Sequence, residues 1–328
     1  MLTAGGEPSA KVMPILAILF YPIPNAGEFS KNCPLQIMKE LDIKVGYECN
    51  NNCVFCLNRD KRYFKEYPIE TLKNQITVSA QGGCQKLIIS GGEPLISKYF
   101  WDLLNFAKEK GIKRIEIQTN GRMLYYEELV QKLKQFEPIE FLVSLHFPNS
   151  KLYKKYCQSE GFPQVVKGIK NLIKHNFNFT VNTVIMKPNL PHLKDMVVFL
   201  KKLGVKNIQY RFIDGKNVMD NYQKFVPKFS QCLPIIRKII KKNPGLAITL
   251  NEIPICVLGE EFKKNLAPIN PTRTNLSIKN RVLNSREIWK TQFVYPNCKN
   301  CRYRPSCRGV RKEYCRIYGT KEFKPISY

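Results

Sequence analysis

Three cysteines stand within eight residues, in the segment Cys49-Asn-Asn-Asn-Cys53-Val-Phe-Cys56. Three neighbouring thiolates can bind a zinc ion, or three irons of a [4Fe–4S] cluster that usually takes four. Zinc would require a fourth cysteine or histidine, and none of the three histidines stands in a zinc-type spacing to these cysteines. The spacing therefore favours an iron–sulfur site with one iron left for another ligand, with zinc as the alternative.

A second group of cysteines lies near the carboxyl end of the chain. It comprises Cys298, Cys301, Cys307 and Cys315, and the single Cys256 precedes it. The remaining single cysteines are read as small buried apolar residues; they are Cys33, Cys84, Cys157 and Cys232. Twelve clustered cysteines in a chain of 328 residues that is 44% hydrophobic do not resemble a secreted disulfide scaffold. We therefore expect a cytoplasmic protein.

Short runs of β-branched residues alternate with longer amphipathic stretches from about residue 41. The predicted strands cover 41–46, 86–90, 112–119, 139–145, 179–186 and 206–213. Helices are predicted near 69–80, 97–110, 125–136, 163–175, 191–203 and 227–242. This alternation predicts parallel strands with right-handed crossovers, and six units are too few to close an eight-stranded barrel.

The predicted fold is thus α/β, a partial (β/α)6 TIM-like barrel with a small C-terminal cysteine-rich module. A flat doubly wound sheet would need a glycine-rich phosphate loop after the first strand, where this chain has cysteines instead. We expect an N-terminal extension at 1–40, the core barrel at 41–245 and the module at 246–328, which opens with a strand at 246–250. The apolar run at 12–24 is too short and too rich in proline to span a membrane.

The formal net charge of +27 suggests a polyanionic partner such as nucleic acid. However, most lysines are scattered over predicted helix faces rather than gathered in one arm. A general preference for lysine explains the charge equally well, so both interpretations stay open.

The C-x3-C-x-Phe-C pattern closely resembles the signature of the radical S-adenosylmethionine (radical SAM) enzymes. That resemblance implies that Cys49, Cys53 and Cys56 are catalytic and hold a [4Fe–4S] cluster, whose fourth iron is chelated by S-adenosylmethionine (SAM). It also implies reductive cleavage of SAM to a 5′-deoxyadenosyl radical, which abstracts a hydrogen atom from the substrate. The missing fourth thiolate would then be the SAM position.

A turn after the second predicted strand supports the resemblance. Its residues Gly91, Gly92, Glu93 and Pro94 resemble the family motif that contacts the SAM amino group. Glycines allow close approach of the backbone to a ligand, and a carboxylate suits an ammonium group. Read alone, such a sequence would be an ordinary turn.

Three further residues are candidates for SAM contacts by resemblance. Phe55 would pack near the adenine, while Ser144 and Asn182 would bond the ribose. The alternatives are a core aromatic residue for Phe55 and ordinary polar residues at strand ends for the other two.

The Cys298–Cys307 segment resembles the auxiliary-cluster element of SPASM and twitch modules. By this resemblance, Cys256, Cys298, Cys301 and Cys307 hold one auxiliary [4Fe–4S] cluster, with Cys315 as the alternative fourth ligand. Arg311 stands where the full pattern has another cysteine, which argues against two auxiliary clusters. A structural zinc ion on the same four thiolates is the alternative.

Relatives of this kind often modify peptides, so the expected substrate is a peptide or protein and the expected reductant a ferredoxin or flavodoxin. The alternatives are a radical SAM enzyme acting on RNA or a small molecule, and a non-enzymatic iron–sulfur electron carrier or zinc-stapled binding protein. The Gly-Gly-Glu-Pro turn argues against a carrier, which has no use for a SAM-binding turn.

Overall fold

The structure is a computed structural model that describes residues 39–62, 67–268, 273–276, 282–284, 293–295 and 298–327. The chain divides into two units, of which the second, residues 37–328, contains all the described residues. The apolar run at 12–24 and Cys33 lie outside the described residues. Everything below concerns the second unit.

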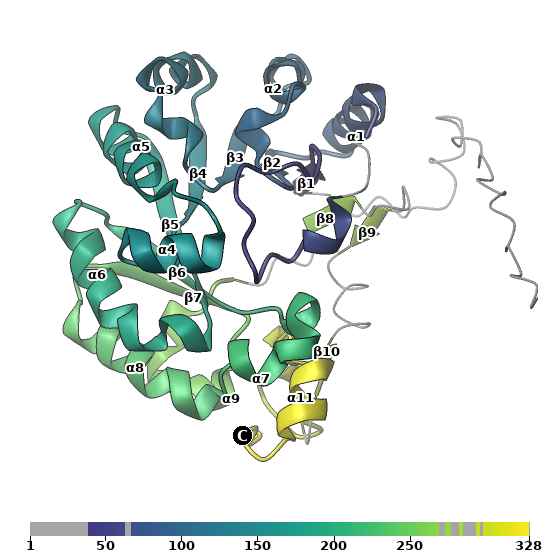
Figure 1. Ribbon diagram of the computed structural model, residues 1–328. Coiled ribbons are helices and arrows are strands. Elements are labelled where there is room, and N and C mark those ends of the chain that lie inside the picture. Colours follow the sequence, from purple (N-terminus) through teal and green to yellow (C-terminus); the bar gives the residue numbers. More distant parts are fainter. Residues whose placement is uncertain are drawn as a thin grey trace, which may run out of the picture. The chain divides into compact units, whose positions relative to one another are not determined.

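Seven parallel strands follow one another across the sheet in chain order (Figure 1). They are β1 (Glu40–Lys44), β2 (Lys86–Ser90), β3 (Arg114–Thr119), β4 (Ile139–Ser144), β5 (Asn178–Ile185), β6 (Asn207–Phe212) and β7 (Ala247–Asn251). The predicted α/β partial barrel is confirmed, and the strand expected at 246–250 joins the same sheet beside β6. On the other edge, β8 (Arg273–Leu276) pairs in parallel with β1, and β9 (Val282–Asn284) pairs antiparallel with β8. The domain boundary near residue 245 stays a prediction.

Helices connect successive strands. They are α1 (Ile69–Gln81), α2 (Phe100–Glu109), α3 (Glu127–Leu133), α4 (Ser150–Cys157), α5 (Phe162–Lys174), α6 (Leu193–Lys202), α7 (Tyr222–Phe225), α8 (Phe229–Lys242), α9 (Ile255–Leu258) and α11 (Lys312–Tyr318). Figure 1 shows α1, α2, α3 and α5 along one side of the sheet. Helix α4 was not predicted; the Asn149 side chain caps it by accepting from the Leu152 amide. No helix within the described ranges is long and apolar enough to cross a membrane.

The two faces of the sheet differ in polarity because successive side chains of a strand point to opposite sides. One face is apolar and fully buried; its residues include Ile43, Ile89, Ile117, Val143 and Val181. The other face carries polar residues on the same strands, among them Ser90, Gln118, Ser144, Asn182 and Gln209. Burial of the apolar face fixes the register, so the polar face is left for a site.

The loop that follows β1 runs directly over the turn that follows β2. The Gly92 amide donates to the Gly46 carbonyl at 2.8 Å, and the Glu93 amide donates to the Glu48 carbonyl at 2.8 Å. A Cβ atom on Gly92 would lie 1.9 Å from the Glu48 oxygen, and one on Gly91 would lie 2.3 Å from the Gly46 oxygen. Side chains are therefore excluded from both glycine positions.

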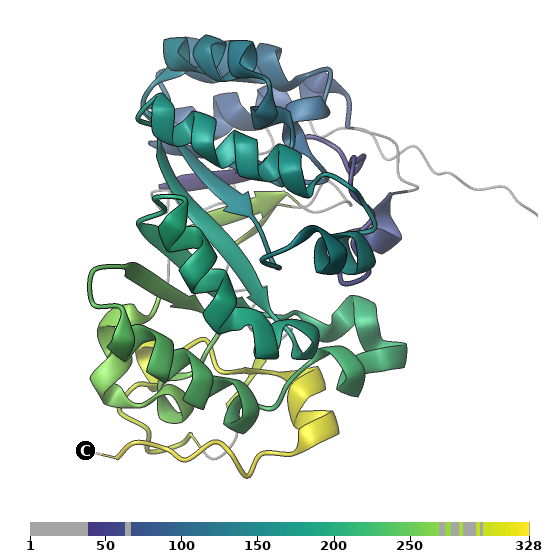
Figure 2. The same ribbon diagram turned by 60° about the vertical axis from the view of Figure 1, so that its left-hand side comes forward.

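Helix α4 holds the same loop from the other side. The Asn52 amide donates to the Cys157 carbonyl and the Val54 amide to the Tyr156 carbonyl, each at 3.0 Å. Inside the loop, the Asn51 amide group donates to the buried Tyr153 hydroxyl at 2.8 Å. The cysteine loop is thus fixed between the strand ends and α4, as the second view also shows (Figure 2).

The C-terminal segment returns to the carboxyl ends of β6 and β7. A two-residue ladder of β10 (Phe293–Val294) and β11 (Val310–Arg311) brackets the second cysteine group. Tyr314 of α11 packs on Phe229 with ring centroids 4.9 Å apart, and its hydroxyl accepts from the Phe229 amide at 2.9 Å. This contact anchors α11 at the start of α8.

A largely buried cluster of four charged residues, of which only Arg211 is substantially exposed, also ties this segment to the barrel. Arg311 donates to Glu252 and Asp214, each at 2.7 Å, while Arg211 of β6 donates to Glu252 at 2.6 Å. Burial alone would raise the pKa of Glu252, but the two guanidinium groups hold it at about 2. Glu252 keeps a left-handed backbone, with φ of +62°. Such a conformation costs about 1–3 kcal/mol and persists only where its surroundings enforce it.

We predict that Arg311→Ala lowers the free energy of unfolding by about 3–5 kcal/mol, because it removes the arginine that pairs with the Asp214 carboxylate and leaves Glu252 with Arg211 alone. Chemical denaturation measures the change. The control is Arg302→Ala, which removes an exposed arginine whose partner is Glu260 and should change stability little. Equal effects of the two substitutions would contradict this role of the buried cluster.

Candidate radical SAM site

The first three cysteines lie in the loop after β1, at the carboxyl edge of the sheet, where parallel barrels carry their active sites. Cys49, Cys53 and Cys56 are free thiols and partly exposed. Burial raises the pKa of Cys49 to about 11, and a hydrogen bond with Cys157 together with burial raises that of Cys53. The Cys49 and Cys53 thiols therefore keep their protons until a metal displaces them.

Two N–H groups point at the Cys49 sulfur. The Asn51 backbone amide lies 3.5 Å from it, and the Asn120 side-chain amide 3.7 Å. The same Asn120 nitrogen donates to Asn50 Oδ1 at 2.6 Å. Arg122 also donates to the Asn50 carbonyl, so residues after β3 hold the first corner of the cysteine loop.

Glu93 is buried between the ends of β2 and β3. Its Oε1 accepts from the Thr119 hydroxyl at 2.6 Å and the Leu95 amide at 3.1 Å, while its Oε2 accepts from the Asn120 amide at 2.7 Å. Burial raises the pKa of Glu93 to about 7 despite these donors. One carboxyl group thus joins the turn after β2 to the end of β3 and titrates near neutral pH.

The Gly-Gly-Glu-Pro turn has a structural role that its residues did not predict. The two glycines were expected to leave space for a bound ligand. In the structure, the space beside Gly91 and Gly92 is filled by the backbone of the cysteine loop. Pro94 begins a short 3-10 turn, Pro94–Ile96. Contact between this turn and SAM stays a prediction.

Ser144 and Asn182 are register partners on neighbouring strands, and Gln209 and Thr249 continue the row across β6 and β7. The Gln209 side chain donates to Asn182 Oδ1 at 3.0 Å. The row therefore offers polar groups from four adjacent strands on the face opposite the apolar core. Ribose contacts for Ser144 and Asn182 stay predictions.

Phe55 is buried and meets His146 edge to face, with ring centroids 5.1 Å apart. His146 Nδ1 accepts from the Val184 amide at 3.2 Å, and burial lowers the pKa of His146 to about 4. A neutral histidine thus supports the ring that precedes Cys56. This packing agrees with the core alternative for Phe55, and a contact with adenine stays a prediction.

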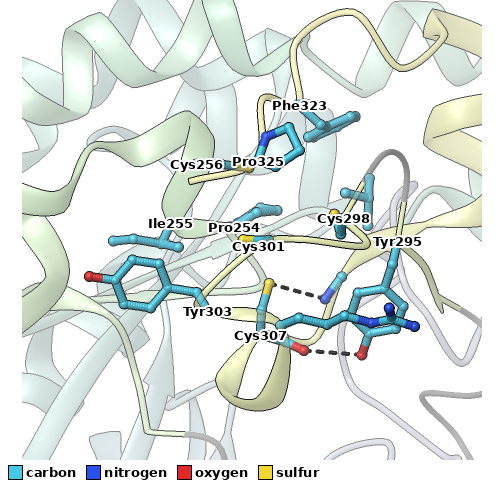
Figure 3. A pocket seen from close by; sticks show the side chains of 13 residues that line it. Pro254, Ile255, Cys256, Tyr295, Cys298, Cys301, Tyr303, Cys307, Phe323 and Pro325 are labelled. Atoms are coloured by element: carbon cyan, nitrogen blue, oxygen red, sulfur yellow. Dashed lines mark hydrogen bonds between the residues drawn. The ribbon is translucent and has the colours of Figure 1, made fainter. Parts of the chain in front are cut away.

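The second cysteine group surrounds a pocket (Figure 3). Its lining includes Cys256, Cys298, Cys301 and Cys307. The pocket has about 370 Å³ of free space, part of it open to solvent. Cys315, the alternative fourth ligand, is not part of this lining. The structure therefore brings together the four cysteines that were predicted as one ligand set.

Local contacts shape this pocket. The Gly309 amide donates to the Cys307 sulfur at 3.3 Å, and the Tyr295 hydroxyl donates to the Cys307 carbonyl at 3.0 Å. Burial, with the neighbouring cysteines, raises the pKa of Cys256 to about 12. As at the first site, ligation would require loss of thiol protons.

Within the described part of the chain, no three His, Cys, Asp or Glu side chains are placed to hold a single metal ion. A zinc ion needs its thiolates about 2.3 Å from one centre, whereas a cube takes one thiolate on each of several irons. Which of the two groups the thiol sets hold stays a prediction.

Sequence reasoning missed the residues that support the sites. Asn120 lies in the Gln-Thr-Asn-Gly segment at the end of β3, where residues 119–121 resemble the family in sequence but were given no contact. Arg122 follows this segment directly and was not considered. Gln209 could have been found from the register of β6 with β5. No sequence pattern marked Glu252 as important, because its partners Arg211 and Arg311 lie far from it in the sequence.

Curated relatives match somewhat more than half of this chain. A Methanocaldococcus jannaschii protein named "Probable GTP 3′,8-cyclase" is 30% identical over 191 residues, which cover 56% of this chain and 62% of that protein. The GTP 3′,8-cyclase of Aquifex aeolicus is 29% identical over 189 residues, or 55% of this chain and 58% of that protein. The matches thus span less than two thirds of these relatives. Their names give no support to the expected peptide substrate.

Solved structures share the fold across more of the chain. Streptococcus suis SuiB bound to S-adenosylmethionine superposes with a TM-score of 0.62 at 17% identity, covering 88% of this chain and 76% of that one. The protein anSMEcpe with bound AdoMet gives a TM-score of 0.62 at 16% identity, covering 87% and 95%. At these identities the likeness shows the fold alone.

The sequence profile of the Radical SAM superfamily matches residues 43–200, which hold the cysteine loop and strands β2 to β5. Membership implies SAM and a [4Fe–4S] cluster as cofactors, and an external reductant. The SPASM or twitch assignment of the C-terminal segment stays a prediction. On the profile match and the sequence relatives, residues 43–200 of this chain are a radical SAM domain, and the chain is an enzyme.

Proposed function

We propose that the chain cleaves SAM reductively at a cluster held by Cys49, Cys53 and Cys56, and that its substrate is a small molecule. The observation that carries the first part is the fixed loop of three free thiols at the carboxyl edge of the sheet. When bound, a [4Fe–4S] cluster with SAM supplies a 5′-deoxyadenosyl radical for hydrogen abstraction.

The chain's own residues position and shield this chemistry. Glu93, in its ionised form, offers negative charge to the SAM ammonium group beside the cysteine loop. Ser144 and Asn182 offer polar atoms to the ribose from the strand ends, and the buried Phe55 keeps water from the loop. Gly91 and Gly92 let the cysteine loop lie close to this turn, and Pro94 starts the 3-10 turn that follows.

The small-molecule substrate rests on the sequence relatives, whose names include GTP 3′,8-cyclase. A purine nucleotide is therefore the first substrate to test. The net charge of +27 favours an anionic substrate of this kind, and it also keeps RNA as a further test. A peptide is the third, because it was the expectation from the cysteine pattern.

We propose that Cys256, Cys298, Cys301 and Cys307 hold one auxiliary [4Fe–4S] cluster. The support is their shared pocket, which opens in part to solvent. We further propose a ferredoxin or flavodoxin as reductant and the cytoplasm as location, since an open cluster requires a reducing compartment.

The first prediction concerns SAM cleavage. Anaerobic protein reconstituted with iron and sulfide, then reduced with dithionite, should release 5′-deoxyadenosine from SAM, measured by chromatography. GTP should increase that release, whereas RNA and peptides should not. Cys53→Ala should release none. The control is Cys232→Ala, which changes a buried cysteine outside the first cysteine loop and outside the lining of the second pocket, and it should behave as wild type. Cleavage that persists in Cys53→Ala would refute the proposed site.

The second prediction concerns the auxiliary site. The double variant Cys298→Ala/Cys301→Ala should retain one cube's iron and sulfide instead of two, because half of the thiol set at the pocket is removed. Cys315→Ala should keep both cubes, since that residue does not line the pocket. Iron loss in Cys315→Ala would assign the fourth ligand there, and zinc in purified protein would support the zinc alternative.

The third prediction follows from Glu93. Its pKa of about 7 means that SAM binding should strengthen as pH rises through about 7, when the carboxylate becomes charged. In the absence of SAM, the effect of pH on stability has the opposite direction. Between pH 4.5 and about 7 the folded protein keeps the Glu93 proton, whereas the unfolded chain has lost it. The free energy of unfolding therefore falls as pH rises through this window.

Titration calorimetry over this pH range measures the effect on SAM binding. Glu93→Gln should bind SAM more weakly and lose the pH dependence. A wild-type affinity that does not change with pH would contradict an ammonium contact by Glu93.

A further inference from the structure

We propose that the Asn120 side-chain amide is a hydrogen-bond donor that raises the reduction potential of the cluster at Cys49, Cys53 and Cys56. The inference rests on the proposed function, since it requires a cluster on these thiols. It concerns a residue to which neither the cysteine motif nor the Gly-Gly-Glu-Pro turn assigns a role.

The amide has a defined orientation. Asn120 Oδ1 accepts from the Arg122 backbone amide at 3.0 Å, so the oxygen cannot exchange places with the nitrogen. The nitrogen is thereby turned to the cysteine loop, where it donates to Asn50 Oδ1 at 2.6 Å and lies 3.7 Å from Cys49 Sγ. The Asn120 backbone is fixed as well, because its amide donates to buried Glu93.

The cysteine loop is held against this donor from several directions. Arg122 donates to the Asn50 carbonyl and lies 3.3 Å from Asn51 Oδ1. Arg62 donates to the Asn51 carbonyl at 2.9 Å. A second N–H group, the Asn51 backbone amide, faces the same sulfur at 3.5 Å. The Cys49 sulfur therefore faces two hydrogen-bond donors, one from the backbone and one from a side chain.

Hydrogen bonds to thiolate sulfurs are among the factors that set the potential of an iron–sulfur cluster. The cluster gains negative charge on reduction, and an N–H donor stabilises that charge on sulfur. Removal of the Asn120 donor should therefore make reduction harder. The residue acts through Cys49 and is a positioning residue, without contact to substrate.

The test is a redox titration of the reconstituted full chain, monitored by electron paramagnetic resonance (EPR). The signal to monitor is that of the cluster at Cys49, Cys53 and Cys56, which is identified by its absence in Cys53→Ala. Asn120→Leu removes the donor and should lower the midpoint potential by about 59 mV, which corresponds to a tenfold weaker one-electron reduction. Asn120→Asp keeps the shape and the acceptor for Arg122, but it replaces the donor with negative charge. It should lower the potential at least as much.

Asn217→Ala is the matched control. The Asn217 side-chain amide donates a hydrogen bond to the Cys56 carbonyl oxygen of the same loop at 2.9 Å. It thus contacts a carbonyl oxygen and not a cysteine sulfur. Its removal should leave the midpoint at the wild-type value. An unchanged midpoint in both Asn120 variants, or an equal shift in Asn217→Ala, would overturn the inference.

A second measurement separates this inference from the proposed function. Iron and sulfide analysis shows whether a cluster assembles, and failure in the wild type would refute the proposed function itself. Protein that contains the cluster is exchanged into deuterated water and reduced. Electron–nuclear double resonance should then detect an exchangeable deuteron near the cluster. That coupling should weaken in Asn120→Leu, and its full retention would overturn the inference alone.

Discussion

The close backbone contact between the β1 loop and the β2 turn is the constraint on which the site depends. Two amide hydrogen bonds of 2.8 Å join these segments, and a side chain on Gly92 would leave no room for them. Because Glu93 follows directly, the same contact brings its carboxyl group to the end of β3. The cysteine loop thereby receives a fixed path before any cofactor binds, which reduces the ordering that binding would require.

The two faces of the sheet have different roles: one packs in the core, and the other carries the polar residues of the candidate site. Its apolar face packs against the helices, while the opposite face gathers polar residues at the carboxyl ends of the strands. The charged cluster of Arg211, Asp214, Glu252 and Arg311 lies at the same edge and joins β6 and β7 to the C-terminal segment. Arg311, which replaces an expected cysteine, thus ties the second cysteine group to the barrel.

The sequence predicted the features that depend on local pattern. Six strands, most of their helices and the first cysteine loop follow from periodicity and spacing, and the structure confirms the partial barrel. Features that depend on distant contacts could not be predicted. The pairing of β8 with β1 and the ion pairs of Glu252 join segments far apart in the chain. Helix α4 was missed because its lysine-rich sequence gives only a short apolar stripe.

The central claim is that three thiols leave one iron of a cluster open to SAM. EPR spectroscopy of the anaerobically reduced protein, recorded before and after addition of SAM, tests it most directly. The account predicts that SAM changes the signal of the cluster that depends on Cys49, Cys53 and Cys56, and leaves any signal that remains in Cys53→Ala unaffected. A reduced cluster on these cysteines whose spectrum does not respond to saturating SAM would contradict the claim.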